Sequence, residues 1–210
     1  MKRTIHPDDA YKMIREMACG KKIDGEEYSL GHVVNVAVLA STIAKLCGLS
    51  SEKAYVLGLL HDIGRLMVYD SNGELDANDR HRHPIAGYKY LTSLGYMEEA
   101  RICVTHAFLG HENTYQCYYD EEENKVVNSI VSSEYDDYDL LIQLADEMSL
   151  VKGWCLLETR LAKKMLAVGL NQRDWDDFCY LHKIKKYFDE RAAEDIYKQV
   201  LLNEKKVIFE

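Results

Sequence analysis

Residues of metal-binding type recur within, or at the ends of, the segments that are patterned as helices. They are His32, His61, Asp62, His83, His106 and Asp146. His61 and Asp62 stand in the middle of residues 57–65, which are apolar nearly all round and therefore predict a buried helix. An imidazole or carboxylate buried there must be hydrogen-bonded, ion-paired or bound to metal, because an unpaired buried charge costs several kcal/mol. Adjacent helical side chains point about 100° apart, yet one small cation at the helix edge could contact both.

Imidazoles combined with carboxylates are donors that suit a divalent cation such as Fe, Mn, Co, Ni, Zn or Mg. Each residue taken alone has a simpler explanation. A lone histidine in an apolar helix is more often a hydrogen-bonded core residue, and Asp146 alone is typical of a charge on a helix surface. The order of the whole set along the chain favours a shared metal site: histidine, then His-Asp, then two histidines, then aspartate.

That order resembles the signature of the HD superfamily of metal-dependent phosphohydrolases. The motif stands here as His32, Leu-His-Asp-Ile-Gly-Arg at 60–65, His-Pro-Ile-Ala-Gly at 83–87, Thr-His at 105–106 and Leu-Ala-Asp-Glu at 144–147. The resemblance covers about residues 28–152. It implies that one metal ion is bound by His32, His61, Asp62 and Asp146. In members with two ions, the aspartate of the His-Asp pair bridges them and further histidines are added, which His83 and His106 match, so the resemblance implies one or two ions per chain.

The chain also departs from parts of the family pattern. Many two-metal members have consecutive histidines where this chain has His106-Ala107, so a second ion would lack a ligand unless His111 or water supplies it. The Gly-Tyr-Pro extension of cyclic-di-nucleotide phosphodiesterases does not match residues 105–111. The chain's size and residues 83–95 resemble small bacterial members that hydrolyse diadenosine tetraphosphate or nucleoside monophosphates.

The resemblance implies hydrolysis of a phosphomonoester or phosphoanhydride by metal-activated water. The expected partner is a small phosphorylated substrate of nucleotide type or similar. Asp62, Arg65 and His106 are the expected catalytic residues, and the expected substrate-binding residues are Arg65, Arg82 and Lys89. The alternative for Arg65 is an ion pair with Asp62, three residues before it. Two other functions stay open: a non-catalytic nucleotide-sensing module, and a di-iron oxygenase on the same scaffold, against which Ala107 argues.

An all-α fold must position these residues, because long periodic segments rich in Ala, Leu, Glu and Lys contain few prolines. We expect a single helical bundle of about seven to nine helices with the metal site in its core. The predicted helices span about 8–20, 30–47, 50–69, 83–95, 97–108, 139–152, 155–168, 171–188 and 191–203. Glycines 58 and 64 are unfavourable inside a helix and therefore indicate that another backbone approaches closely there.

Polar segments separate these helices. Ser29, Ser50 or Ser51, and Asn171 or Asp174 are the expected N-caps. Residues 70–81 and 110–128 predict loops, although 126–131 could begin a short helix. The second loop contains an acidic run at 120–123, and its tyrosines either pack the loop down or stack on a base: Tyr115, Tyr118 and Tyr119.

Composition bounds the class of protein. A chain of 210 residues with 47% hydrophobic residues is long enough for one domain, 1–210, with an HD core at about 28–152 and a C-terminal helical extension at 153–210. The net charge of −9 argues against binding a nucleic-acid polymer. The apolar runs are too short to span a membrane, and a homodimer is compatible with the charged C-terminal segment. The start lacks the apolar core of a signal peptide. Six cysteines without a Cys-x-x-Cys pair favour a reducing compartment, so we expect a cytoplasmic protein.

Overall fold

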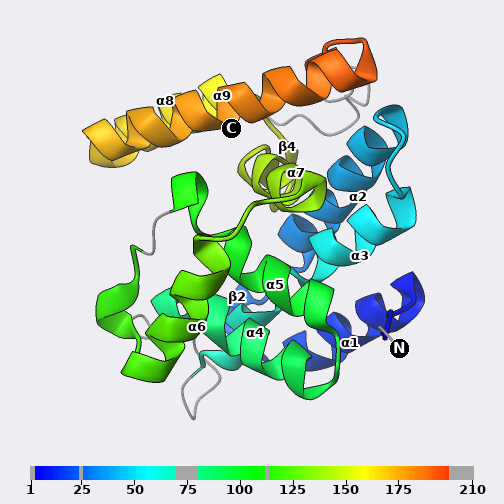
Figure 1. The fold of residues 1–210 in the computed structure, drawn as a ribbon, viewed down its shortest axis with the longest axis vertical. Helices are drawn as coiled ribbons and strands as arrows, with labels where there is room; N and C mark the ends of the chain where they lie inside the picture. The colour runs from blue at the N-terminus through cyan, green and yellow to red at the C-terminus, as the bar shows by residue number, and fades with distance from the viewer. Residues whose placement is uncertain (1–2, 24–25, 70–79, 112–113, 199–210) are drawn as a thin grey trace.

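The computed structural model describes residues 3–23, 26–69, 80–111 and 114–198 (Figure 1). The predicted all-α fold is confirmed. The α-helices of the described residues are α1 (Pro7–Ala18), α2 (Gly31–Leu46), α3 (Ser51–Leu60), α4 (His83–Ser93), α5 (Met97–Thr105), α6 (Glu121–Val131), α7 (Asp137–Glu147), α8 (Leu157–Val168) and α9 (Gln172–Ala192). Short 3-10 helices join them: η1 (Ile63–Met67), η2 (Arg80–Arg82), η3 (Leu109–His111) and η4 (Gln116–Tyr118). Within this part of the chain, no helix combines the length and apolar character that crossing a bilayer requires.

Two small antiparallel hairpins complete the described elements. Strand β1 (Lys22–Ile23) pairs with β2 (Glu26–Glu27), with Lys22 opposite Glu27. Strand β3 (Ser149–Leu150) pairs with β4 (Gly153–Trp154), with Ser149 opposite Trp154. The second hairpin occupies residues that were predicted to continue a helix to 152, so α7 ends five residues earlier than expected.

The core packs α2 against α3, both of these helices against α7, and α1 against α3. Gly58 marks the close approach of the first pair, because a Cβ there would lie 2.6 Å from the Cα of Ala37. A Cβ on Gly64 would lie 1.9 Å from the carbonyl oxygen of His83, which begins α4. Both glycines therefore sit where another backbone leaves no room for a side chain, as the sequence predicted.

The helix predicted over 50–69 is shorter than expected, although Ser50 is its N-cap and accepts from the backbone N–H of Lys53. It ends at Leu60, so His61 is its C-cap and Asp62 follows it, and neither stands in mid-helix. Side chains take the carbonyls that further helical turns would use. The imidazole Nδ1 of His61 lies 2.7 Å from the Gly58 oxygen, and the Cys103 thiol donates to the Leu60 oxygen.

The acidic run at 120–123 begins helix α6 and is not a loop, which corrects the prediction for 110–128. Asp120 accepts from the backbone N–H of Glu123 at 2.8 Å, and Glu123 accepts from that of Asp120 at 3.0 Å. This reciprocal pair is a capping box. Acidic side chains are favourable there because they face the positive end of the helix dipole.

Several other predicted boundaries also shift. Ser29 accepts from the backbone N–H of Gly31, but the N-cap of α2 is Leu30. Asn171 caps α9 as expected, and that helix continues to Ala192, so the predicted helices 171–188 and 191–203 overlap one long helix. Residues 70–79 of the first loop and residues 199–203 of the last predicted helix lie outside the described residues.

A buried carboxylate ties α7 to the end of α5. Asp139 accepts from the Nη2 of Arg101 at 2.8 Å and from the hydroxyl of Thr105 at 2.7 Å. The amide of Gln143 donates to the Thr105 carbonyl at 2.7 Å. These contacts fix the last helical residue before His106, and thus the direction of that imidazole.

We expect Asp139→Asn to lower the free energy of unfolding by about 2 kcal/mol, because hydrogen bonds to a charged acceptor are lost in a buried place. Asp139 is 1% exposed, and Arg101 would lose its partner charge. Urea denaturation of the two proteins measures the difference. Glu122→Gln, at an exposed position, is the control and should change it by less than about 0.5 kcal/mol. Equal stability of the Asp139→Asn protein and the wild type would contradict a stabilising role for these hydrogen bonds.

Candidate metal centre

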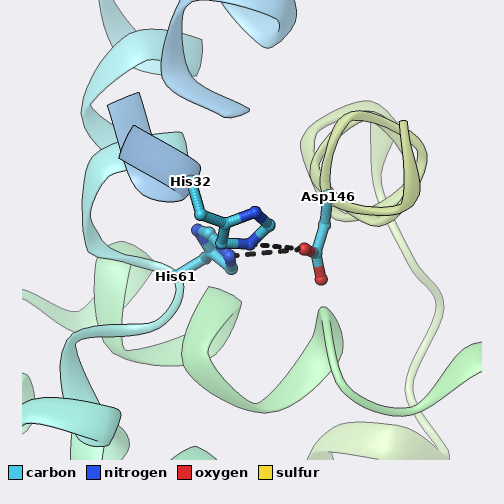
Figure 2. A group of neighbouring side chains, drawn as sticks. All are labelled: His32, His61 and Asp146. Atoms are coloured by element: carbon cyan, nitrogen blue, oxygen red, sulfur yellow. Dashed lines mark ion pairs between the residues drawn. The ribbon is translucent and has the colours of Figure 1, made fainter. Parts of the chain in front are cut away.

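Three helices bring the first group of donors together. His32 lies in the first turn of α2, His61 ends α3, and Asp146 is the penultimate residue of α7. The Nε2 of His32 lies 2.9 Å from Oδ1 of Asp146, and the Nε2 of His61 lies 3.7 Å from the same oxygen. Figure 2 shows both imidazoles directed at this carboxylate. Oδ2 of Asp62 completes the group, 3.9 Å from the His32 nitrogen and 3.7 Å from that of His61.

The other oxygen of Asp62 faces a second group of donors. Its Oδ1 lies 3.4 Å from the Nε2 of His83, at the start of α4, and 3.3 Å from the Nε2 of His106, which caps α5. The two imidazole nitrogens are 3.3 Å apart. The Asp62 carboxylate therefore stands between two pairs of histidines, with one oxygen toward each pair.

Backbone carbonyls set the orientation of two imidazoles. The Nδ1 of His61 is 2.7 Å from the Gly58 oxygen, and the Nδ1 of His106 is 2.9 Å from the Ile102 oxygen. Since a carbonyl can only accept, Nδ1 carries a proton in each ring, and Nε2 is the nitrogen that faces the cluster.

The donor set fits a divalent cation. Among the described residues, the buried Nε2 of His61 and Oδ1 of Asp62 have no hydrogen-bond partner. Two groups of possible metal ligands, His32–His61–Asp146 and His61–Asp62–His106, each have all their ligand atoms within 4.8 Å of one another. Imidazole nitrogens and carboxylate oxygens that converge in this way would be satisfied by a cation.

Both aspartates carry their negative charge. Burial alone would raise the pKa of Asp62, but the guanidinium of Arg65, with Nε 2.5 Å from Oδ2, and the neighbouring His61, His106 and His83 together outweigh burial and hold that pKa well below its usual range. Burial would likewise raise the pKa of Asp146, and His32 and His61 together reverse the direction. For His32, the effect of burial is to lower the pKa, yet Asp146 raises it overall. Because a ligating imidazole must be unprotonated, a cation and a proton compete for His32.

Residues 29–150 match the family model described as HD domain, which is more than half of the chain. This chain belongs to the HD-domain family. Neither the curated proteins nor the solved structures with which the chain was compared gave a match. The matched region contains all six histidines and aspartates of the cluster, and α8 and α9 lie beyond it.

Membership of the HD-domain family indicates what kind of site the cluster is. HD domains bind divalent metal ions and belong to a superfamily of metal-dependent phosphohydrolases, which agrees with the donor set described above. Next to His106, Ala107 contributes to the cavity wall but offers no ligand atom. The prediction that His111 fills this position falls on a side chain outside those described.

A cavity of about 390 Å³ opens from the HD-domain cluster toward solvent. Arg65, His83, His106 and Asp146 belong to its wall. The geometry is compatible with both predicted roles of Arg65, the ion pair with Asp62 and phosphate binding. Its side chain pairs with Asp62 and is still 43% exposed on the cavity wall. Two further basic side chains on this wall were not predicted, because no sequence motif marks them: Lys164 of α8 and Arg173 of α9, which come from outside the matched region.

Arg82 and Lys89, the other predicted substrate-binding residues, have a different partner. Both contact Oε1 of Glu123, at 2.6 and 2.7 Å, and Arg82 also donates to the carbonyl of Tyr118. Glu123 is 3% exposed and needs such partners, which join α6 to α4. Neither cation is among the described residues that line the cavity at the cluster, so the geometry gives their predicted role no support.

The tyrosines of the second loop mostly pack against neighbouring rings. Tyr118 stacks on His81 with ring centroids 4.4 Å apart, and the hydroxyl of Tyr119 donates to the His81 carbonyl. Tyr115 packs edge-on against Phe108 and also reaches the cavity wall. Tyr115 is therefore the described tyrosine of this loop that is placed to contact a ligand.

Proposed function

We propose that this protein is a metal-dependent phosphohydrolase that cleaves a small phosphorylated substrate, of nucleotide type or another phosphate ester or anhydride. One observation carries the proposal. The Asp62 carboxylate lies within 3.9 Å of four imidazole nitrogens, two of which, from His83 and His106, belong to residues that line an open cavity, and a partly exposed arginine on the same wall contacts the carboxylate.

The residues of the cavity suit hydrolysis of a phosphate ester. A divalent cation supplies a Lewis acid that polarises a phosphoryl oxygen and makes water more acidic. His32, His61, Asp62 and Asp146 would hold one such ion, and His83 and His106, whose Nε2 atoms lie 3.4 and 3.3 Å from Oδ1 of Asp62, would contribute to a second. Arg65 is placed to bind a phosphate oxygen from the cavity side, because its guanidinium offers donors beyond the one that contacts Asp62.

The test combines metal analysis with a substrate panel. The purified protein should contain near-stoichiometric divalent metal and release phosphate from one or more phosphomonoesters, nucleotides or dinucleoside polyphosphates. Chelation should abolish the release, and adding back Mn, Fe, Co, Ni, Zn or Mg should restore it with at least one ion. Metal-free protein that is silent across the panel would contradict the proposal. Nucleotide binding without turnover would favour the sensing module, and a redox-active mixed-valent iron pair would favour the oxygenase.

Replacing Arg65 separates substrate binding from metal binding. In protein loaded with saturating metal, we expect Arg65→Met to lower kcat/KM by about 10- to 100-fold, the equivalent of a charge-assisted hydrogen bond to the substrate, while the metal content stays stoichiometric. Steady-state kinetics and metal analysis of the same preparation measure the two effects. Arg15→Met, at an exposed position of α1, is the matched control. A parallel fall in metal content would show that Arg65 acts through Asp62 instead.

A further inference from the structure

The cavity at the cluster does not end at α7. A second cavity of about 440 Å³ continues from it, bounded by the end of α7, β3, α8 and α9. Figure 1 shows α8 and α9, in yellow to orange, crossing the molecule beside α7 and away from α4 and α6. The two cavities share five lining residues, so they form two halves of one cleft: Leu109, Glu147, Lys164, Asp174 and Asp177.

The second half, called the α8–α9 groove here, is apolar where the first is polar. Its apolar wall consists of Leu109, Leu150, Leu157, Leu161, Phe178 and Leu181. Four of the charged residues on its wall form two ion pairs with one another. Nε of Arg160 lies 3.5 Å from Oε2 of Glu147, and Lys164 forms an ion pair with Asp174.

We propose that the α8–α9 groove binds the organic part of the substrate, and that this part is an alkyl or aryl group. The inference rests on the proposed function, since it assumes that the phosphate lies at the cluster beside Arg65. A monoester held there would extend past the shared residues Glu147 and Lys164 into the groove. Water attacks phosphorus, the P–O bond to the organic part breaks, and the leaving oxygen takes a proton, which gives inorganic phosphate and an alcohol.

The chemistry of the groove decides between classes of organic group. Each hydroxyl of a sugar or polyol would lose its water against leucine and phenylalanine side chains without a replacement partner, which is unfavourable. An alkyl or aryl group instead gains about 0.8 kcal/mol for each methylene removed from water. The groove is continuous with the metal centre. Its apolar walls therefore fit the organic group of a substrate whose phosphate is bound at that centre.

A homologous series of substrates tests the inference. For ethyl, butyl and hexyl phosphate, we expect kcat/KM of the metal-loaded wild type to rise by up to about 4-fold per methylene, the equivalent of about 0.8 kcal/mol. Glycerol phosphate should be hydrolysed no better than ethyl phosphate. Leu161→Gln should flatten the dependence on chain length, because Leu161 is half-buried on the groove wall. Leu166→Gln is the control on the same helix, since Leu166 is 89% exposed.

Calorimetry with methyl-, butyl- and hexylphosphonate provides a readout that does not need turnover. Affinity that rises with chain length in the wild type and in Leu166→Gln, but not in Leu161→Gln, supports the groove. If no ester in the series or the panel is hydrolysed while this pattern holds, the proposed hydrolysis fails and the groove assignment stands. A flat series in the wild type, or an equal loss in both variants, overturns the groove assignment whether or not the protein is a hydrolase.

Discussion

Asp62→Ala protein is expected to contain no bound metal and to release no phosphate from any substrate of the wild type. The carboxylate presents Oδ2 to His32 and His61 and Oδ1 to His83 and His106, so its loss removes a donor from both halves of the cluster. Since altering even an outer residue of a metal site costs about 10- to 100-fold in affinity, we expect a loss of more than about 100-fold here. Metal analysis and phosphate release measure the two effects.

The fold should survive this change, which makes the loss interpretable. Arg65 would lose its partner, but its side chain is 43% exposed and can be solvated. Circular dichroism should therefore show an unchanged helical spectrum. Asp8→Asn is the matched control, because the Asp8 side chain is 95% exposed, and it should retain metal and activity. If Asp62→Ala keeps its metal, the ion is bound elsewhere and the assignment of the cluster fails.

Gly64→Ala is expected to lower the free energy of unfolding by about 3 kcal/mol or more, as over-packing does when neither side can yield. The added Cβ would lie 1.9 Å from the carbonyl oxygen of His83 and 2.7 Å from the backbone nitrogen of Gly87. Both atoms belong to the backbone of α4, so the helix itself must move away from η1. Because His83 begins α4, the same shift should displace its imidazole from Asp62.

Gly87→Ala provides the comparison for this prediction. Its added Cβ would lie 2.9 Å from the Sγ of Cys103, a side-chain atom, and its nearest backbone atom would be the nitrogen of Gly64, at 3.2 Å. We therefore expect a smaller loss, about 1 kcal/mol, and partial recovery when Cys103→Ala is added. Urea denaturation with metal analysis distinguishes the cases. Equal losses for Gly64→Ala and Gly87→Ala would show that backbone contact with α4 is not the cause.

Much of the metal centre could be predicted from the sequence because its ligands are carried by short, recognisable motifs. The residues around His61 and Asp146 identify the set, and the structure brings all six candidates together. The place of His61 within its helix could not be predicted. Where the helix ends, the His61 ring and the Cys103 thiol contact carbonyls of its last turn, and the second of these contacts comes from another helix.

The roles of individual arginine and lysine side chains were also harder to predict, because their partners come from distant parts of the sequence. Arg82 and Lys89 stand close to the motif in sequence, yet a carboxylate more than thirty residues later, Glu123, holds both. Lys164 and Arg173 lie far from the motif but reach the cavity because α8 and α9 fold beside α7. The capping box at 120–123 was visible in the sequence, but four consecutive acids also fit a solvated loop.

The six donors span residues 32–146 and are contributed from the ends of five different helices and the residue that follows one of them. An unfolded chain would scatter these atoms, so an ion that needs them together binds the native state alone. Free metal at 100 times its dissociation constant would then add about 2.7 kcal/mol to the folding equilibrium. Cellular metal supply would in this way set how long the protein survives as well as how fast it works.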